Sequence, residues 1–182
     1  MTSTIQNPVG EAAGARATEK VVTKDAIEQF LYREARYLDD KEYEKWLECY
    51  AEDVVYWVPS WADDARLTED PQSEMSLMYY NGKGGLTDRV FRIRTERSAA
   101  TSVPEPRTSH LLGNIEIIGR SGDNIDVRYN WHTMYLRYDE IDPMYGTSFV
   151  TIDFSGEEPL IRRKTTVLKN DLIHHVVDIY HL

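Results

Sequence analysis

The stretch IDVRYNWHTMYLRY, residues 125–138, is the longest run of the chain that has the composition of a β-strand. It is rich in aromatic and β-branched residues, which favour strands. Strands commonly have about five or six residues, so a run more than twice as long predicts a bent or bulged strand in a strongly curved sheet.

Shorter strand-like runs surround this stretch, and two amphipathic helices precede them. Apolar residues recur with helical spacing over 27–38 and 43–50, with Thr23 and Asp40 as expected N-caps, and an arginine-rich helix is expected over 87–96. The other expected strands are Val54–Val58, Thr108–Ile118, Gly146–Phe154, Leu160–Lys169 and Leu172–Tyr180. Helices first and strands afterwards indicate an α+β fold, with antiparallel neighbours and the helices on one face of the sheet.

Length and composition narrow the class of protein. The chain has 182 residues, of which 41% are hydrophobic, and this suits a single domain over residues 23–182 after a flexible N-terminal leader, residues 1–22. The net charge of −10 argues against nucleic-acid binding, which needs a basic surface. No apolar run approaches the ~18 residues of a membrane span, and we see no secretory signal. We therefore expect a cytoplasmic protein.

Metal ligands and general bases are scarce. Cys49 is the single cysteine, so the chain cannot by itself supply the cysteines of an iron–sulfur cluster. His132 on the long strand could act as a base if the sheet encloses a pocket, and the competing interpretation is a half-buried histidine bonded to a backbone carbonyl. His174 and His175 are neighbours on an expected strand, so they should point to opposite faces and cannot chelate one ion together. We expect no catalytic, cofactor-binding or metal-binding residue here.

Two further motifs favour structural roles. Asp39, Asp40, Glu52 and Asp53 bracket the second expected helix, where an acid–base pair is conceivable but helix caps and solvated turns explain them better. The glycine-rich stretch 82–85 lacks the spacing of a phosphate-binding loop, and we expect a turn there.

Arginine and aromatic residues point to protein contacts. Arg92, Arg94 and Arg107 concentrate positive charge in an acidic chain, and Trp57 and Trp61 fall in or near an expected loop. This combination is typical of interfaces and of ion pairs with acidic residues of the helix pair or of a partner subunit. An anionic ligand such as a carboxylated aromatic is the alternative.

Several longer segments carry a resemblance. They are FLYREARYLDDKEYEKWLECYAEDVVYWVPSW (30–61), LTEDPQSEMSLMYYNGKGGLTDRVFRIRTERSAAT (67–101) and PEPRTSH (104–110). Together they resemble the small (β) subunits of the aromatic-ring-hydroxylating dioxygenases. The segment from Asn130 to the end is similar to the benzoate and toluate branch in particular.

The resemblance implies a fold and a division of labour. The fold is an NTF2-like (cystatin-like) cone, a curved mixed sheet wrapped around helices. The implied assembly is an α3β3 terminal oxygenase whose larger α subunit carries a Rieske [2Fe–2S] cluster and a mononuclear Fe(II). Electrons come from NADH through a separate reductase, and the reaction is the O2-dependent cis-dihydroxylation of an aromatic carboxylate. A Rieske centre needs two cysteines, so the cysteine count agrees that this chain is mainly structural.

Two other functions compete with this interpretation. The same fold class includes free-standing isomerases and dehydratases, for which His132 would be the base inside the cone. A binding module for an acidic aromatic ligand would use Arg94 or Arg107 as its anchor. A closed, packed interior favours the structural subunit, whereas an open pocket of several hundred Å3 with convergent polar groups favours the other two.

Overall fold

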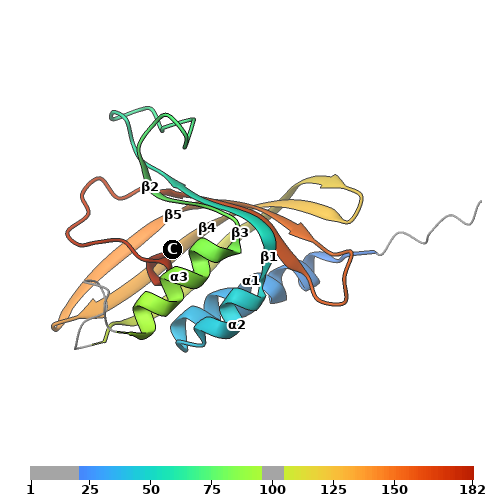
Figure 1. Ribbon diagram of the computed structural model, residues 1–182, viewed down its shortest axis with the longest axis horizontal. Helices are drawn as coiled ribbons and strands as arrows, with labels where there is room; N and C mark the ends of the chain where they lie inside the picture. Colours follow the sequence, from blue (N-terminus) through green and yellow to red (C-terminus); the bar gives the residue numbers. More distant parts are fainter. Residues whose placement is uncertain (1–20, 96–104) are drawn as a thin grey trace, which may run out of the picture.

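In the computed structural model, which describes residues 21–95 and 105–182, one six-stranded sheet curls over the helices, which all lie against the same face (Figure 1). The strand order is β2-β1-β6-β5-β4-β3, and only the β1–β6 pair is parallel. The elements are α1 (Lys24–Asp39), α2 (Tyr43–Glu48), β1 (Tyr50–Pro59), β2 (Ser76–Asn81), α3 (Lys83–Arg94), β3 (Arg107–Ser121), β4 (Asn124–Arg137), β5 (Glu140–Asp153), β6 (Leu160–Leu168) and the 3-10 turn η1 (Ile179–His181). The α+β prediction and the curved mixed sheet are confirmed.

The predicted long strand is present as β4, but the bulges are on the neighbouring strand β3. β4 pairs with β5 in unbroken register along its whole length. The register shifts are in the β3–β4 ladder, between Gly113 and Glu116 and between Ile117 and Gly119. Bulges of this kind increase local twist, which helps the sheet curl over the helices.

The first helix begins where the sequence predicts. The Thr23 hydroxyl accepts a hydrogen bond from the backbone N–H of Ala26 at 3.2 Å, as an N-cap does. The prediction that Asp40 caps the second helix is wrong, because Asp40 ends α1 and Glu42 precedes α2 without a side-chain bond. None of the helices in the described ranges is long and apolar enough to cross a membrane.

Three other expectations are corrected. The strand β2 went unpredicted, and the glycine-rich stretch after it is not a turn but the start of α3, with Gly82 at φ 97° as the entry residue. Residues 172–180 form no strand; the segment runs irregularly into η1, where the Asp178 carboxylate accepts from the N–H of Ile179 at 2.8 Å. His174 and His175 therefore do not lie on a strand, and the prediction that they point to opposite faces of the sheet does not apply.

The expected leader falls almost wholly outside the described residues. Of residues 1–22, the structure describes Val21, which is exposed, and Val22, which is buried against the core. The packed part of the chain therefore includes Val22, one residue before the expected boundary.

At Gly146, β5 packs so closely against β6 and the Trp131 ring that a side chain has no room. A Cβ there would lie 2.0 Å from the backbone oxygen of Val167 and 2.9 Å from the Trp131 ring, so the sheet itself would have to shift. We expect Gly146→Ala to lower the free energy of unfolding by about 1–3 kcal/mol or more, measured by urea denaturation. Gly113→Ala is the matched control, since a Cβ there meets nothing within 4 Å. Equal stability of the two variants would contradict this packing.

Candidate functional site

A buried ion pair fills the interior of the cone. The carboxylate of Glu34 on α1 and the ammonium of Lys164 on β6 lie 3.0 Å apart, and both side chains are 2% exposed. The same oxygen of Glu34 accepts from the Tyr50 hydroxyl at 2.6 Å and from the Trp46 indole N–H at 2.8 Å. Four elements, α1, α2, β1 and β6, thus meet at one carboxylate oxygen.

The pair stays ionised in the interior. Burial alone would raise the pKa of Glu34, but the charge of Lys164 and the three hydrogen bonds outweigh it and lower the pKa below its usual value. Burial would lower the pKa of Lys164, and Glu34 outweighs that effect and raises it. A general acid or base needs a pKa near the working pH, and both shifts move away from neutrality.

The surface hollows do not reach this pair. One hollow of about 410 Å3 lies beside α1, and another of the same volume lies beside His174 and His175 at the end of the β4–β5 hairpin. Neither is lined by Glu34 or Lys164. With both side chains 2% exposed, the ion pair itself is closed to solvent.

His132 is not a base inside the cone. Its neighbour Trp131 points into the core, so His132 faces out, where it is exposed and meets the Tyr145 ring edge-on at 5.6 Å. Both sequence interpretations of His132 are wrong, because strand alternation places it on the outer face of the sheet.

Sequence reasoning missed a chain of two histidines at η1, the half-buried His175 and the buried His181. His181 is fully buried, and its Nδ1 accepts from the backbone N–H of Asp178 at 2.7 Å. Neutral His181 therefore carries its proton on Nε2, which lies 3.2 Å from Nε2 of His175. His175 in turn faces the Asp142 carboxylate through Nδ1 at 3.2 Å. The hydrogen bond from the Asp178 backbone thus determines which ring nitrogens of His181 and His175 carry protons.

Sequence reasoning also missed the partner of Asp39. Its carboxylate accepts from the Thr108 hydroxyl and the backbone N–H of His110, both at 2.9 Å, and lies 2.6 Å from Nδ1 of His110. Burial raises the pKa of Asp39, but its bonds to His110 prevail and lower it. The pair joins the end of α1 to β3, and no spacing in the sequence indicates it.

The face of the sheet away from the helices is apolar and exposed. Cross-strand partners share a face, and the register gives one row across the sheet, from Tyr79 through Trp57, Thr165 and Phe149 to Arg128. We call this surface the open sheet face; the side chains that define it are Trp57, Tyr79, Arg107, Leu111, Arg128, His132, Met134, Ile141, Tyr145 and Phe149.

The structure brings together only some of the interface candidates. Trp57 and Arg107 share the open sheet face, and Trp61, 43% exposed, follows β1 and donates to the carbonyl of Leu168 at 2.7 Å. Arg92 and Arg94 lie on α3 instead. The interface role of all five stays a prediction.

Within the described residues, the arginines of α3 differ in their partners. Arg94 forms a two-point ion pair with Glu44 of α2, and Arg89 binds the buried Asp178 at 2.8 Å. Arg92 is exposed and pairs with no carboxylate of the described ranges. The structural ion-pair interpretation fits Arg94.

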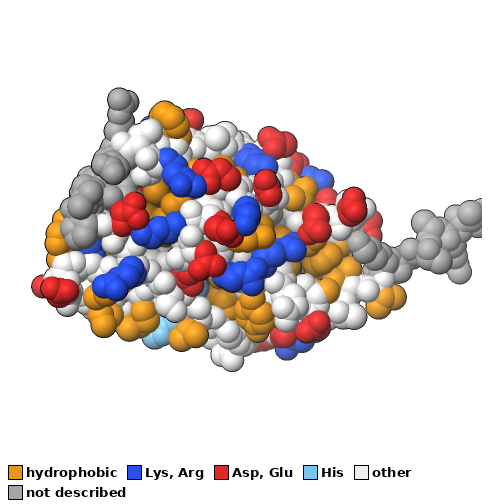
Figure 2. Space-filling view, turned by 90° about the horizontal axis from the view of Figure 1, so that it is seen from below, with side chains coloured by type: hydrophobic (Ala, Val, Ile, Leu, Met, Phe, Trp, Pro, Cys, Tyr) orange, Lys and Arg blue, Asp and Glu red, His pale blue; other side chains and the backbone are white. Residues whose placement is uncertain are grey.

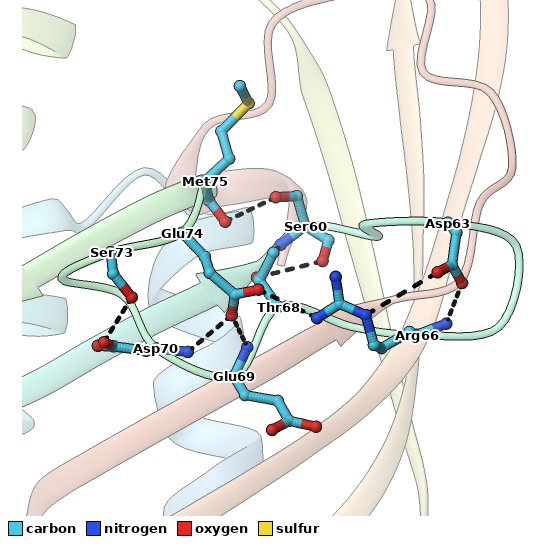
Figure 3. Close-up of polar contacts among 9 residues, drawn as sticks. All are labelled: Ser60, Asp63, Arg66, Thr68, Glu69, Asp70, Ser73, Glu74 and Met75. Carbon is cyan, nitrogen blue, oxygen red and sulfur yellow. Dashed lines mark hydrogen bonds and ion pairs between the residues drawn. The ribbon is translucent and has the colours of Figure 1, made fainter.

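The loop after β1 is ordered by its own carboxylates (Figure 3). Residues 60–73 form an acidic loop that projects from the sheet (Figure 1). Glu74 accepts from the backbone N–H groups of Glu69 and Asp70 and from Arg66 at 3.0 Å. The Glu69 backbone bond is the largest cause that lowers the pKa of Glu74 to about 2.

The donor atoms of this chain do not suit an iron–sulfur cluster. Burial raises the pKa of the Cys49 thiol to about 12, which opposes the thiolate that a metal needs. Within the described ranges, no group of three His, Cys, Asp or Glu side chains could hold a metal ion.

A curved mixed sheet over N-terminal helices, with a buried ion pair between them, defines an NTF2-like fold. The family model described as "Ring hydroxylating beta subunit" matches residues 33–175, and the chain belongs to this family. It is 54% identical to a toluate 1,2-dioxygenase subunit beta of Pseudomonas putida, with 88% of this chain and 99% of that one covered. It is 51% identical to a benzoate 1,2-dioxygenase subunit beta of Acinetobacter baylyi, covering 92% and 99%.

A solved structure agrees. The crystal structure of the beta subunit of the benzoate 1,2-dioxygenase from Burkholderia mallei superposes with a TM-score of 0.77 at 47% identity, over 90% of this chain and 99% of that one. As a beta subunit of this family, the chain has an alpha subunit as its partner.

The buried ion pair gives a stability prediction. We expect Lys164→Met to lower the free energy of unfolding by about 3–5 kcal/mol, because it leaves Glu34 without its counter-charge in the interior. Glu34→Gln combined with Lys164→Met should be less costly, since no charge remains buried. Lys45→Met, which breaks the exposed pair with Glu42, is the control and should have no measurable effect. A double variant less stable than Lys164→Met would contradict this account.

The histidine chain gives a pH prediction. Burial lowers the pKa of His175 and, more strongly, that of His181, so both stay neutral in the folded state when the unfolded chain takes up protons. Stability contributed by these groups is therefore complete above about pH 6.5 and is lost as the pH falls below it, by up to about 1.4 kcal/mol per pH unit and group.

Urea denaturation between pH 7.5 and 5.5 tests this. We expect His175→Gln to reduce the loss of stability over this interval relative to the wild type. The exposed His132→Gln is the control and should keep the wild-type dependence. A His175→Gln profile parallel to the wild type would show that this chain of histidines does not set the pH dependence.

Proposed function

We propose that this chain is the small (β) subunit of the terminal oxygenase of a benzoate/toluate-type aromatic-ring-hydroxylating dioxygenase. The complex carries out the NADH- and O2-dependent cis-dihydroxylation of an aromatic carboxylate in aromatic degradation. This chain is mainly structural and supports the α subunit. The observation that carries the proposal is the buried Glu34–Lys164 pair, which occupies the place where an enzyme of this fold would need an open pocket.

The partner supplies the redox chemistry in this proposal. The α subunit holds the Rieske [2Fe–2S] cluster and the mononuclear Fe(II), an α3β3 hexamer forms in the cytoplasm, and a separate reductase delivers electrons from NADH. The single, buried Cys49 supports this assignment, since this chain cannot provide the ligands of such a cluster. The high identity to the toluate and benzoate subunits over nearly their whole length supports the substrate class.

We assign subunit contact to the open sheet face. It combines exposed aromatic and aliphatic side chains with three arginines, Arg107, Arg128 and Arg163, of which Arg128 is paired with Glu116 at 3.4 Å. Apolar surfaces with aromatic residues and arginines are typical of interfaces. Trp57 and Arg107 belong to this face, whereas Arg92 and Arg94 would act from α3.

The free-standing enzyme is the weaker candidate. It requires a base inside the cone, and the structure places His132 outside it. Of the histidines that line hollows, His175 is bonded to Asp142 and His181, and His110 is bonded to Asp39.

Co-purification with a matched pair of variants tests the proposal. We expect the tagged chain, isolated from its native cells, to bring a larger partner with the visible absorption of a Rieske cluster, because the cofactors reside in that partner. Phe149→Asp should abolish this, because it places a charge in the open sheet face, where Phe149 is 39% exposed. Phe91→Asp on α3, at a phenylalanine 62% exposed, is the control and should leave the complex intact.

The outcomes separate the two claims. A colourless chain that emerges alone would overturn the subunit assignment. A complex lost in Phe91→Asp but retained in Phe149→Asp would keep the subunit assignment and refute the open sheet face as its contact surface. Thermal unfolding of both isolated variants shows whether either one simply fails to fold.

A further inference from the structure

The hollow beside α1 has the size of a small-molecule site. It lies between the first turns of α1 and the turn that joins β5 to β6, and its volume is about 410 Å3. Small-molecule sites commonly measure about 300–1,000 Å3. We call it the α1 hollow.

Its floor is apolar. Val22, Phe30 and Phe154 line it with side chains that are otherwise buried in the core, and Ala26 and Pro159 add to the wall. The exposed Ala26 and the small accessible parts of the Phe30 and Phe154 rings, 3% and 5% exposed, offer an apolar surface that a flat ring can contact.

Its rim is cationic. Arg33 and Arg36, one turn apart on α1, both line the hollow. The guanidinium of Arg33 lies 5.6 Å from the centre of the Phe30 ring and donates to Glu158 at 2.9 Å. Glu158 is 71% exposed, and a surface pair of this kind contributes little, so another carboxylate can replace it at small cost.

Arg36 is available as a second anchor. Its guanidinium lies 5.8 Å from the Tyr37 ring, and no carboxylate of the described residues forms an ion pair with it. In the space-filling view of the helix side, basic side chains stand directly beside hydrophobic ones (Figure 2). An apolar floor with guanidinium groups at its edge matches a ligand that has a ring at one end and a negative charge at the other.

We propose that the α1 hollow binds a small aromatic carboxylate, with its ring against Phe30 and Phe154 and its carboxylate on Arg33 and Arg36. The expected anchors of such a ligand, Arg94 and Arg107, do not line this hollow, and Arg94 is already paired with Glu44. The inference rests on the lining of the hollow and does not depend on the function proposed above.

NMR titration of the full chain with benzoate as the probe tests the site. We expect saturable shifts at α1 and at residues 154–159. Arg36→Gln and Arg33→Gln should each weaken binding by about tenfold, the usual effect of one lost charge-assisted hydrogen bond. Ala26→Phe should abolish binding by filling the hollow without a change of charge. Arg92→Gln is the control, since it removes an exposed arginine elsewhere, and should bind as the wild type does.

Benzyl alcohol and the assembled complex complete the test. Benzyl alcohol, which has the ring without the charge, should bind at least about tenfold more weakly than benzoate. Equilibrium dialysis of the complex isolated through this chain should count one more benzoate per chain in the wild type than in Ala26→Phe. Shifts that do not saturate, wild-type affinity in both arginine variants, or equal counts in the two complexes would each overturn the proposal.

Discussion

The structure depends on one buried carboxylate oxygen. Lys164, Tyr50 and Trp46 all donate to the same oxygen of Glu34, so a strand, a second strand and two helices are held at a single point. Such a pair adds little net stability compared with a well-packed apolar substitute, but removing one partner is costly because the other charge stays buried. We infer that its main contribution is to define a single docking of α1 under the sheet. The same groups occupy the space that a catalytic cone would keep open.

The pleat of each strand determines together which side chains point into the core and which lie on the outer face of the sheet. Because successive residues of a strand point to opposite faces, Lys164 can reach Glu34 only if its neighbours Arg163 and Thr165 point outward. Thr165 lies in the cross-strand row that includes Trp57 and Phe149. A slip of β6 by one residue would therefore remove the ion pair and rearrange the open sheet face at the same time. The interior charge thus helps to fix the register on which the outer surface depends.

The sequence predicts the regular parts of this fold well. Long runs with clear spacing, such as 27–38 and 125–138, were assigned correctly because their apolar faces are buried as the period requires. The segment 172–180 was not, because its alternation of apolar and polar residues resembles a strand, while the Asp178 carboxylate and the His181 ring turn the backbone into η1. The sequence predicts a turn at Gly84 and Gly85, yet both lie in the first turn of α3, where Gly85 packs closely against the Tyr80 ring.

The candidate site was predictable only in part, for a related reason. Sequence spacing reports on neighbours within one element, whereas Glu34 and Lys164 are 130 residues apart and Asp39 and His110 are 71 apart. No local pattern distinguishes these partners from other charged residues. The likeness to a family, carried by long segments, could indicate the assembly role that single residues could not.

The distribution of charge follows from that role. The chain carries a net charge of −10, yet much of its acid lies away from the sheet, in the ordered loop over residues 60–75 and on the helices. On the open sheet face, Glu116 is paired with Arg128, and aromatic side chains fill the row beside them. Burying unpaired charge costs several kcal/mol, so the pairing of Arg128 with Glu116 lowers the cost of covering this part of the face. The acidic loop and the sheet face thus differ in charge: acid in the loop keeps the chain hydrated, whereas the charged side chains of the sheet face are mainly arginines, Arg107, Arg128 and Arg163, set among apolar ones.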